Sequence, residues 1–433
     1  MSNIAPADKT NNDAEAVETV EAVDVLISGA GPSGAVAAAL LRQQGLQVLV
    51  IEREQFPRFS IGESLLPQSM QYLEQAGMLQ AIVEAGFQFK NGAAFMRNGC
   101  YTDFDFRDKH SNGWGTTYQV QRADFDHVLA REAERFGAEI RYRHEVTAIE
   151  LAEAGSTPGP KRGPRVTVRA PDGSHYRVQA RFMLDASGFG RVLPRLLKLE
   201  TPSNFPVRSA LFAHIADGIN DPAFDRNKIR VTVHPQHDDV WFWTIPFAGG
   251  RCSQGVVAET GFLERYQGTK TERLRAIIVE EPSLHTLLTN ARWDTPARQI
   301  TGYSANVDRL WGEGYALLGN AGEFLDPVFS SGVTIAVKSA SLAAGVLARQ
   351  FAGEEVDWQA EYGAPLRKGV DTFRAFVESW YAGGFQKIIF RKDQQPEIRR
   401  MIASILAGYA WDPSNPFARD TPRRLAALEA LCS

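Results

Sequence analysis

The amino-acid sequence predicts an α/β fold with an inserted antiparallel sheet and a helical layer at the C-terminus. Three observations predict it. A strand, a glycine-rich turn and a helix stand near the start of the chain, alternating strand patterns fill its middle, and helical patterns follow one another after residue 333. The chain has 433 residues, of which 44% are hydrophobic, so it can bury one large core or two fused cores.

The glycine-rich turn predicts a Rossmann-like nucleotide-binding domain. A short apolar run, residues 23–27, leads directly into a G-A-G-P-S-G turn at residues 29–34, which opens a helical pattern through Arg42. The next strand, residues 47–51, ends in an acidic residue about twenty positions after the turn, as in dinucleotide-binding proteins. The glycines let the backbone approach a pyrophosphate at a helix N-terminus, and the acidic side chain accepts from ribose hydroxyls. The expected contacts are Gly29, Gly31, Ser33, Gly34, Glu52 and Arg53.

The remaining pattern divides the chain into four parts. They are a disordered tail, a discontinuous nucleotide-binding domain, a substrate-facing antiparallel sheet and a helical cap, at residues 1–21, 22–200 with 300–345, 205–300 and 346–433. Alternating apolar residues at 228–234 and 240–245 support the sheet, and Gly, Pro, Lys and Arg cluster in an expected loop at 155–165. The candidate helices of the C-terminal part are residues 337–351, 362–382, 396–407 and 422–432.

Composition excludes several classes of protein. A formal net charge of -4, with the arginines dispersed, offers no basic surface for nucleic acid. The first 21 residues lack the basic start and apolar core of a secretory signal, and no run of 18 apolar residues predicts an integral membrane segment. The three cysteines have no C-x-x-C spacing, which fits a reducing compartment, so we expect a cytoplasmic protein. The eight histidines show no metal-ligand spacing, and no metal is expected.

Four further features carry a resemblance to a known family. Residues 56–67 form a loop, called here the strap loop, that reads F-P-R-F-S-I-G-E-S-L-L-P. Residues 241–246 read W-F-W-T-I-P, residues 324–332 read F-L-D-P-V-F-S-S-G, and Lys90 follows the strap loop. Together with the glycine turn, these features resemble the flavin-dependent halogenases, which share a W-x-W-x-I-P signature, an F-x-x-P-x-x-S-x-G pattern and an essential lysine. The likeness is strongest to the members that act on phenols and pyrroles.

The wider superfamily, which includes the aromatic hydroxylases, implies FAD as the cofactor. Residues 119–126, 185–188 and 318–322 resemble its flavin-binding elements. The FAD contacts that the resemblance implies, beyond those of the glycine turn, are Ser64, Arg122, Asp185, Gly188, Asn320, Pro327 and Gly332. The family usually has Asp where Asn320 stands. An amide can still hydrogen-bond a ribityl hydroxyl, but it carries no charge to influence the flavin potential.

The resemblance also implies a two-component mechanism. Reduced FAD, supplied by a separate NAD(P)H-dependent flavin reductase, reacts with oxygen to form a hydroperoxide, and a halide attacks the distal oxygen to give hypohalous acid. The halide is expected at the backbone N–H groups of Ser330, Ser331 and Gly332, where a predicted helix begins.

Three side chains then act on the oxidant and the substrate. The resemblance makes Lys90 the catalytic residue, which directs the oxidant either by a hydrogen bond to hypohalous acid or by forming a haloamine. The haloamine requires a neutral amine, so Lys90 has to be desolvated or near positive charge. Trp241 and Trp243 are implied gatekeepers that keep the aromatic substrate away from the flavin, while Phe242, on the other face of the strand, is expected in the core.

One departure from the family narrows the substrate class. Tryptophan halogenases carry a glutamate directly before the Ser-Thr-Gly turn, and Phe329 stands there in this chain. The missing carboxylate implies a more reactive ring, a phenol or a pyrrole, either free or tethered to a carrier protein. Two alternatives remain open: an FAD-dependent aromatic monooxygenase, and a non-catalytic FAD-binding subunit, for which only Asn320 argues.

Overall fold

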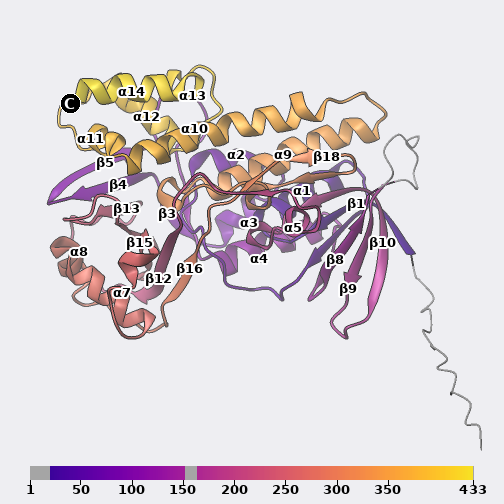
Figure 1. Cartoon of the computed structure of the whole chain (residues 1–433), viewed down its shortest axis with the longest axis horizontal. Helices are drawn as coiled ribbons and strands as arrows, with labels where there is room; N and C mark the ends of the chain where they lie inside the picture. Colours follow the sequence, from indigo (N-terminus) through magenta and orange to yellow (C-terminus); the bar gives the residue numbers. More distant parts are fainter. Residues whose placement is uncertain (1–19, 152–162, 433) are drawn as a thin grey trace, which may run out of the picture.

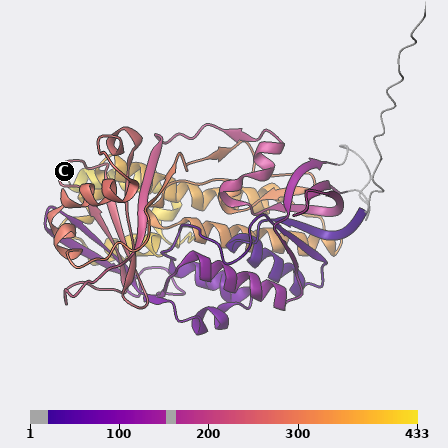
Figure 2. The same cartoon turned by 90° about the horizontal axis from the view of Figure 1, so that it is seen from below.

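Two large sheets at opposite ends of the molecule, with long helices running over both, organise the chain (Figure 1). A computed structural model describes residues 20–151 and 163–432. The view from below shows the same separation of the two sheets (Figure 2). The α/β fold predicted from the sequence is confirmed.

The first sheet is the predicted Rossmann-like sheet. Its strands lie in the order β18-β19-β10-β1-β2-β7, and the central pairs β10-β1 and β1-β2 are parallel. Their bounds are β1 Val20–Ser28, β2 Val48–Glu52, β7 Glu139–Tyr142, β10 His175–Asp185, β18 Trp311–Gly312 and β19 Tyr315–Leu317. Every residue of β2 is buried, as expected for a parallel strand covered on both faces. The helix α1 (Pro32–Gln43) follows β1 directly, so the strand, turn and helix stand where the sequence predicted them.

Two predicted boundaries need correction. The expected disordered tail at residues 1–21 extends too far, because β1 begins at Val20 and pairs with β10 from its first residue. Residues 1–19 lie outside the described part of the chain. Most of the expected loop at 155–165 lies outside it as well, and Arg165 already begins β9 (Arg165–Arg169), which pairs with β8 (Glu145–Glu150) and β10.

The second sheet is larger than the sequence predicted. Its seven strands lie in the order β16-β12-β15-β14-β13-β4-β5. They are β4 Gly92–Arg97, β5 Cys100–Asp105, β12 Arg208–Ala216, β13 Lys228–Val233, β14 Trp241–Phe247, β15 Arg251–Glu259 and β16 Arg298–Thr301. The predicted range of 205–300 left out β4 and β5, because β4 pairs with β13, more than a hundred residues later in the chain. That pairing is parallel, so the sheet is not wholly antiparallel.

One face of this second sheet carries helices that were not predicted. They are α6 Thr260–Leu263, α7 Lys270–Val279 and α8 Pro282–Leu287. Phe242 and Val256 form a separate hydrophobic cluster with Leu274 and Ile277 of α7. Trp241 and Trp243 point to the opposite face and belong to the main core. Phe242 is therefore a core residue, as its alternation with the two tryptophans predicted.

The C-terminal part is helical. Its helices are α9 Gly332–Phe351, α10 Ala364–Tyr381, α11 Gly384–Ile389, α12 Pro396–Leu406, α13 Pro416–Arg419 and α14 Thr421–Cys432. Within the described residues, α9 alone is long and apolar enough to span a membrane by length and composition, but it is mostly buried and packs against α1. It is a core helix that connects the nucleotide-binding sheet to the helical layer.

Short elements complete the connections between the sheets. They are α2 Pro67–Gln75, α3 Leu79–Glu84, β3 Gln88–Lys90, β6 Thr117–Gln119, α4 Arg122–Arg135, α5 Val192–Leu196, β11 Glu200–Thr201 and β17 Asn306–Val307. The strap loop runs between β2 and α2 and contacts both sheets, because Phe56 packs against Tyr142 of β7 and Phe59 stacks on Phe212 of β12.

Candidate functional site

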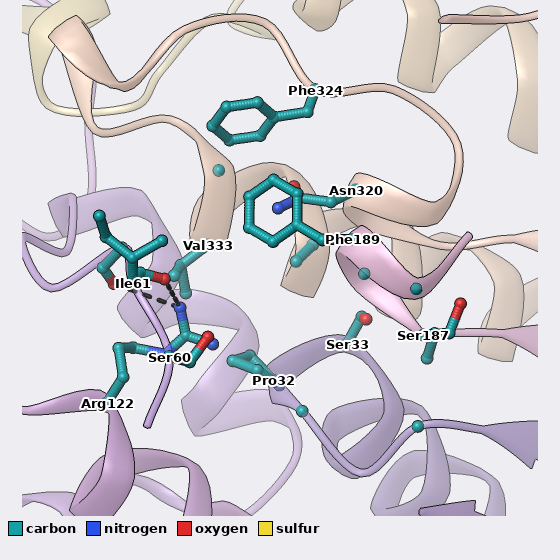
Figure 3. A pocket seen from close by; sticks show the side chains of 18 of the residues that line it. Pro32, Ser33, Ser60, Ile61, Arg122, Ser187, Phe189, Asn320, Phe324 and Val333 are labelled. Carbon is teal, nitrogen blue, oxygen red and sulfur yellow. Dashed lines mark hydrogen bonds between the residues drawn. The ribbon is translucent and has the colours of Figure 1, made fainter. Parts of the chain in front are cut away.

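A cavity of about 390 Å³ lies where the two sheets meet. Its walls come from the turn between β1 and α1, the strap loop, the turn after β10, the segment before α9 and the inner face of the second sheet. Figure 3 shows Phe189, Asn320 and Phe324 gathered on one side of it, opposite Ser60 and Ile61 of the strap loop.

The glycines of the turn leave space in which neighbouring backbone segments pack closely and a ligand can approach the backbone. Gly29 has φ +98°, and a Cβ there would lie 2.6 Å from the Ala186 carbonyl oxygen. A Cβ on Gly34 would lie 1.9 Å from the Gly29 carbonyl oxygen. Gly31 differs, because it faces the cavity and has an ordinary φ of −66°. No side chain caps the α1 N-terminus, so its first N–H groups remain available to an anion beside Gly31.

Glu52 and Arg53 follow this turn at the end of β2. The Glu52 carboxylate accepts hydrogen bonds from the backbone N–H of Ala30 and of Glu54, each at 2.8 Å, and still lines the cavity. Glu52 thus braces the glycine turn and keeps lone pairs for a ribose hydroxyl. Arg53 lines the cavity rim with a largely exposed side chain.

Two guanidinium groups converge on the cavity beside α1. Arg122 donates to both carboxylate oxygens of Asp126, at 2.7 and 3.0 Å, and to the backbone carbonyl of Ile61 (Figure 3). Arg58 of the strap loop donates to the same Asp126 at 2.9 Å. Two positive charges therefore share one buried carboxylate, which leaves a net positive charge next to an uncapped helix N-terminus. This arrangement fits the pyrophosphate of FAD. Arg58 was not predicted, because its role depends on Asp126, which is 68 residues away.

Lys90 is completely buried at the end of β3. Its Nζ donates to the Ser64 hydroxyl and to the Leu65 carbonyl, both at 2.7 Å, and lies 5.5 Å from the centre of the Phe106 ring. Burial lowers the pKa of Lys90 to about 7. Ser64 lines the cavity, so this hydrogen bond connects the amine to the strap loop at the cavity wall.

Trp241 and Trp243 form part of the cavity wall on β14. Their ring centroids are 6.0 Å apart. The Trp243 indole N–H donates to the Ser253 hydroxyl, and that of Trp241 donates to the Tyr381 hydroxyl, each at 3.0 Å. A Cβ on Gly255 would lie 2.3 Å from the Trp243 ring, so a glycine is required opposite this indole. Both rings are held in place by a hydrogen bond as well as by packing.

The predicted halide segment forms a tight turn before α9. Ser330 adopts the left-handed conformation with φ 57° and ψ 23°, and Ser331 stands at the N-cap of α9 without capping it by its side chain. Pro327, Ser330 and Gly332 line the cavity, whereas Ser331 is buried. A Cβ on Gly332 would lie 3.2 Å from the Phe324 ring. The free N–H groups at the start of this helix can bind a small anion.

The remaining predicted FAD contacts divide into two kinds. Gly188 and Asn320 line the cavity. Asp185 does not, because its carboxylate accepts from the backbone N–H of Ser187 at 2.9 Å and of Leu193 at 2.6 Å. Burial raises the pKa of Asp185. Its role is to hold the turn that carries Gly188, not to face the cavity.

Glu63 of the strap loop was not predicted as a site residue. It lines the cavity and hydrogen-bonds the His214 imidazole through Oε1, while Oε2 is buried and finds no partner among the residues that the structure describes. His214 belongs to a His-Ile-Ala tripeptide that resembles an iron-binding motif. Across residues 20–151 and 163–432, no group of three or more His, Cys, Asp or Glu residues could hold a metal ion. The partner of His214 is a carboxylate of the cavity wall.

Phe329 points away from the cavity. It packs edge-on against Phe376, Trp380 and Phe385 in the helical layer. Phe329 is therefore part of the hydrophobic core.

Comparisons with known proteins show the family of the chain. A family model described as an FAD binding domain matches residues 22–361. The chain is 26% identical, over 94% of each sequence, to the 1H-pyrrole-2-carbonyl-(peptidyl-carrier protein) chlorinase of Pseudomonas fluorescens. Among solved structures it is similar to the flavin-dependent brominase Bmp2, with 26% identity and a TM-score of 0.79 over 95% of this chain and 99% of that one. It is also similar to a flavoprotein/dehydrogenase from Cytophaga hutchinsonii, with 42% identity and a TM-score of 0.90 over 95% and 99%.

Proposed function

The chain belongs to the FAD-binding-domain family that includes the flavin-dependent halogenases, and on that premise we propose that it halogenates an electron-rich aromatic ring with chloride or bromide. It is an FAD-dependent oxidoreductase. The observation that carries the proposal is the buried Lys90 amine, which is hydrogen-bonded to Ser64 of the strap loop, a residue that lines the same cavity as Trp241 and Trp243.

We propose that FAD lies along this cavity, because residues suited to its pyrophosphate and its ribose line the wall. The uncapped α1 N-terminus with Arg58 and Arg122 would hold the pyrophosphate, Glu52 the ribose, and Asn320 with the Pro327–Gly332 turn the flavin end. When bound and reduced, FAD supplies, with oxygen, the oxidising equivalents that turn a halide into hypohalous acid. We propose a separate NAD(P)H-dependent flavin reductase as the source of the reduced cofactor, because the glycine turn provides one dinucleotide site and no second such turn occurs in the sequence.

The chain's own groups then control the halide and the oxidant. In this proposal the N–H groups of Ser331 and Gly332 hold the halide at the start of α9. The N–H of Ser330, which was expected to take part, instead donates to the Pro327 carbonyl at 3.0 Å. The neutral Lys90 amine can take the halogen from hypohalous acid, forming a haloamine and releasing water, and can then pass it to the ring in exchange for a ring proton. The charged ammonium can instead donate a hydrogen bond that orients hypohalous acid.

The substrate is a phenol or a pyrrole in this proposal. Phe329 offers no carboxylate to assist a weakly activated ring, so the ring itself has to be reactive. The relative from Pseudomonas fluorescens is named for a pyrrole carried on a peptidyl-carrier protein, which makes a tethered substrate the first one to test after free substrates. The three cysteines are all free, which supports a reducing compartment, the cytoplasm.

Mass spectrometry of reaction products tests the proposal. Purified protein is incubated with FAD, NADH, a flavin reductase, oxygen and bromide, together with a panel of phenols and pyrroles, free and carrier-tethered. A bromine isotope doublet that disappears in Lys90→Ala, while FAD binding persists, is the expected result. A halide-independent gain of one oxygen would identify a monooxygenase instead, and no turnover of any substrate would favour a non-catalytic FAD-binding subunit.

A further inference from the structure

The Asp326 carboxylate lies where three segments meet, namely its own turn, the segment that carries Tyr303 and the end of α10. It is buried, with 3% of its surface exposed. Its Oδ1 accepts from the Val328 backbone N–H at 3.0 Å. Its Oδ2 accepts from the hydroxyls of Tyr381 at 2.9 Å and Tyr303 at 3.3 Å. A carboxylate that only stabilised its own turn would need only the hydrogen bond from Val328. The hydrogen bonds from the two tyrosine hydroxyls therefore require a further explanation.

The hydrogen bonds continue from Asp326 to the cavity wall. Tyr381 is the last residue of α10, and its hydroxyl accepts from the Trp241 indole N–H at 3.0 Å while it donates to Asp326. The Arg208 guanidinium lies 3.7 Å from the centre of the Tyr381 ring and packs against its face. Trp241 is 1% exposed, and Nε1 is its one polar side-chain atom, so Tyr381 satisfies the whole hydrogen-bonding capacity of this indole.

The charges around Asp326 favour a carboxylate at neutral pH. Burial raises the pKa of Asp326 to about 6, and the hydrogen bonds from Val328 and Tyr381 and the charge of Arg208 oppose that rise. The groups that face it are the Tyr303 and Tyr381 hydroxyls and Arg208, which is itself within 4 Å of Asp239 and Glu259. An ionised carboxylate accepts and never donates, and three donors converge on Asp326 here.

We propose that Asp326 is a positioning residue that holds the Trp241 indole in the cavity wall through Tyr381, and thereby keeps the aromatic substrate apart from the flavin. This inference rests on the proposed function. It gives the helical layer a part in the choice of product, because the hydroxyl that fixes the indole comes from α10. If the indole is released, a substrate ring can approach the flavin, and oxygen transfer to the ring competes with halide oxidation.

Two substitutions break the chain of hydrogen bonds at different points. Asp326→Asn keeps the size of the side chain, but an amide nitrogen cannot accept, so at least one of the three donors, Val328 and the two phenols, loses its acceptor. Tyr381→Phe removes the acceptor of the Trp241 indole. Tyr362→Phe is the control, because it makes the same change at a tyrosine that is more deeply buried than Tyr381 and whose hydroxyl donates to the Leu317 backbone carbonyl instead of to Asp326.

The first measurement does not depend on turnover. In protein labelled with ¹⁵N-tryptophan, the Trp241 indole N–H signal is assigned by its absence from Trp241→Phe. We expect this signal to shift in Asp326→Asn and in Tyr381→Phe and to stay in place in Tyr362→Phe. An unchanged signal in both test variants would overturn the inference, whether or not the protein halogenates. A shift in all three variants would overturn it too, because the indole would then report general loosening.

The second measurement follows the products. We expect the ratio of oxygenated to halogenated product to rise about tenfold in both test variants, which corresponds to the loss of one charge-assisted hydrogen bond, with FAD affinity unchanged. In the unmodified protein the ratio should also rise as the pH falls through about 6, where Asp326 takes up a proton, and Asp326→Asn should show no such rise. A shifted indole signal with unchanged product ratios would contradict the positioning role. If the unmodified protein halogenates no substrate, and the indole signal still responds as expected, then the proposed function is wrong. The conclusion that Asp326 positions the Trp241 indole remains correct in that case.

Discussion

The Lys90 side-chain nitrogen lies 2.7 Å from the Ser64 hydroxyl oxygen, so a hydrogen bond joins the buried end of β3 to the strap loop. The second acceptor of this amine, the Leu65 carbonyl, belongs to the same loop. All of its hydrogen bonds to the described residues are thus to neutral oxygens. No carboxylate compensates the charge, and this is why burial alone sets the protonation of Lys90.

The pH dependence of halogenation separates the two roles of Lys90. Its pKa is about 7, and the neutral amine dominates above that value. If the amine carries the halogen, we expect the rate to rise as the pH increases through about 7 and then to level off. A rate that falls over the same range would instead show that the ammonium form acts by hydrogen bonding. Lys90→Arg, which stays charged throughout, should be inactive at every pH in the first case and partly active in the second.

The buried Lys90 amine should also affect the free energy of unfolding of the protein. The folded pKa lies below the unfolded value of 10.5, so between about 7 and 10.5 the unfolded chain binds a proton that the folded chain does not. The free energy of unfolding contributed by this group therefore rises with pH across that window. Lys90→Met should stabilise the protein at pH 7 by roughly 2 kcal/mol, because the removed cost of burying an amine exceeds the two lost hydrogen bonds. Chemical denaturation at pH 7 and pH 10 checks this, and the gain should shrink at the higher pH.

Substitutions of Gly31 and of Gly29 should affect different properties, namely FAD affinity and stability. Gly31→Val places a side chain beside the flexible Arg58 side chain, in the expected path of the pyrophosphate, with an ordinary backbone conformation. FAD affinity should fall at least about tenfold with little change in the melting temperature of the FAD-free protein. Gly29→Ala meets the Ala186 carbonyl at 2.6 Å and a positive φ, so it should destabilise the FAD-free protein by roughly 3 kcal/mol. Equal melting temperatures for the two variants would show that the turn has been misinterpreted.

The strap-loop residue Arg58 should contribute to the affinity for FAD. Arg58→Gln removes one of the two guanidinium groups that share Asp126, and we expect about a tenfold loss of FAD affinity. Arg135→Gln is a suitable control, because it makes the same change on the exposed surface of α4, where Arg135 pairs with Glu132. Fluorescence titration with FAD measures both. Similar affinities for the two variants would remove Arg58 from the site.

Asn320→Asp tests the departure from the family pattern. Asn320 lines the cavity, and its Oδ1 lies 3.8 Å from the Cβ position of Gly332 in the halide turn. A carboxylate there adds negative charge beside the flavin, which should disfavour the reduced cofactor and lower its potential by some tens of millivolts. Spectroelectrochemistry on the loaded protein measures the change. Asn290→Asp, on an exposed loop after α8, should leave the potential unaltered.

Local sequence patterns predicted the elements whose contacts are local. The glycine turn, the strand that ends in Glu52 and the alternation around Phe242 all depend on neighbours in the sequence, and the structure has them as predicted. The C-terminal helices α10, α12 and α14 also begin and end within about two residues of their predicted bounds.

Pairings between distant residues could not be predicted in this way. The strand β4 joins the second sheet because Gly92 to Met96 pair with Lys228 to Thr232, and no feature of either segment specifies the other. The place of Asp326 in a turn explains one of its oxygens, which accepts from the Val328 backbone N–H. Its two phenol partners are 23 and 55 residues away and come from different segments, so its larger role became visible only in three dimensions.

The place of β4 and β5 in the second sheet has a consequence for protein engineering. A chimera that exchanges only residues 205–300 between two relatives would leave β13 without the matching partner strand that it pairs with along five residues. Crossover points should therefore transfer residues 92–105 together with the inserted segment. Recombination libraries built on this fold need paired exchanges, even though residues 106–204 separate the two pieces in the sequence.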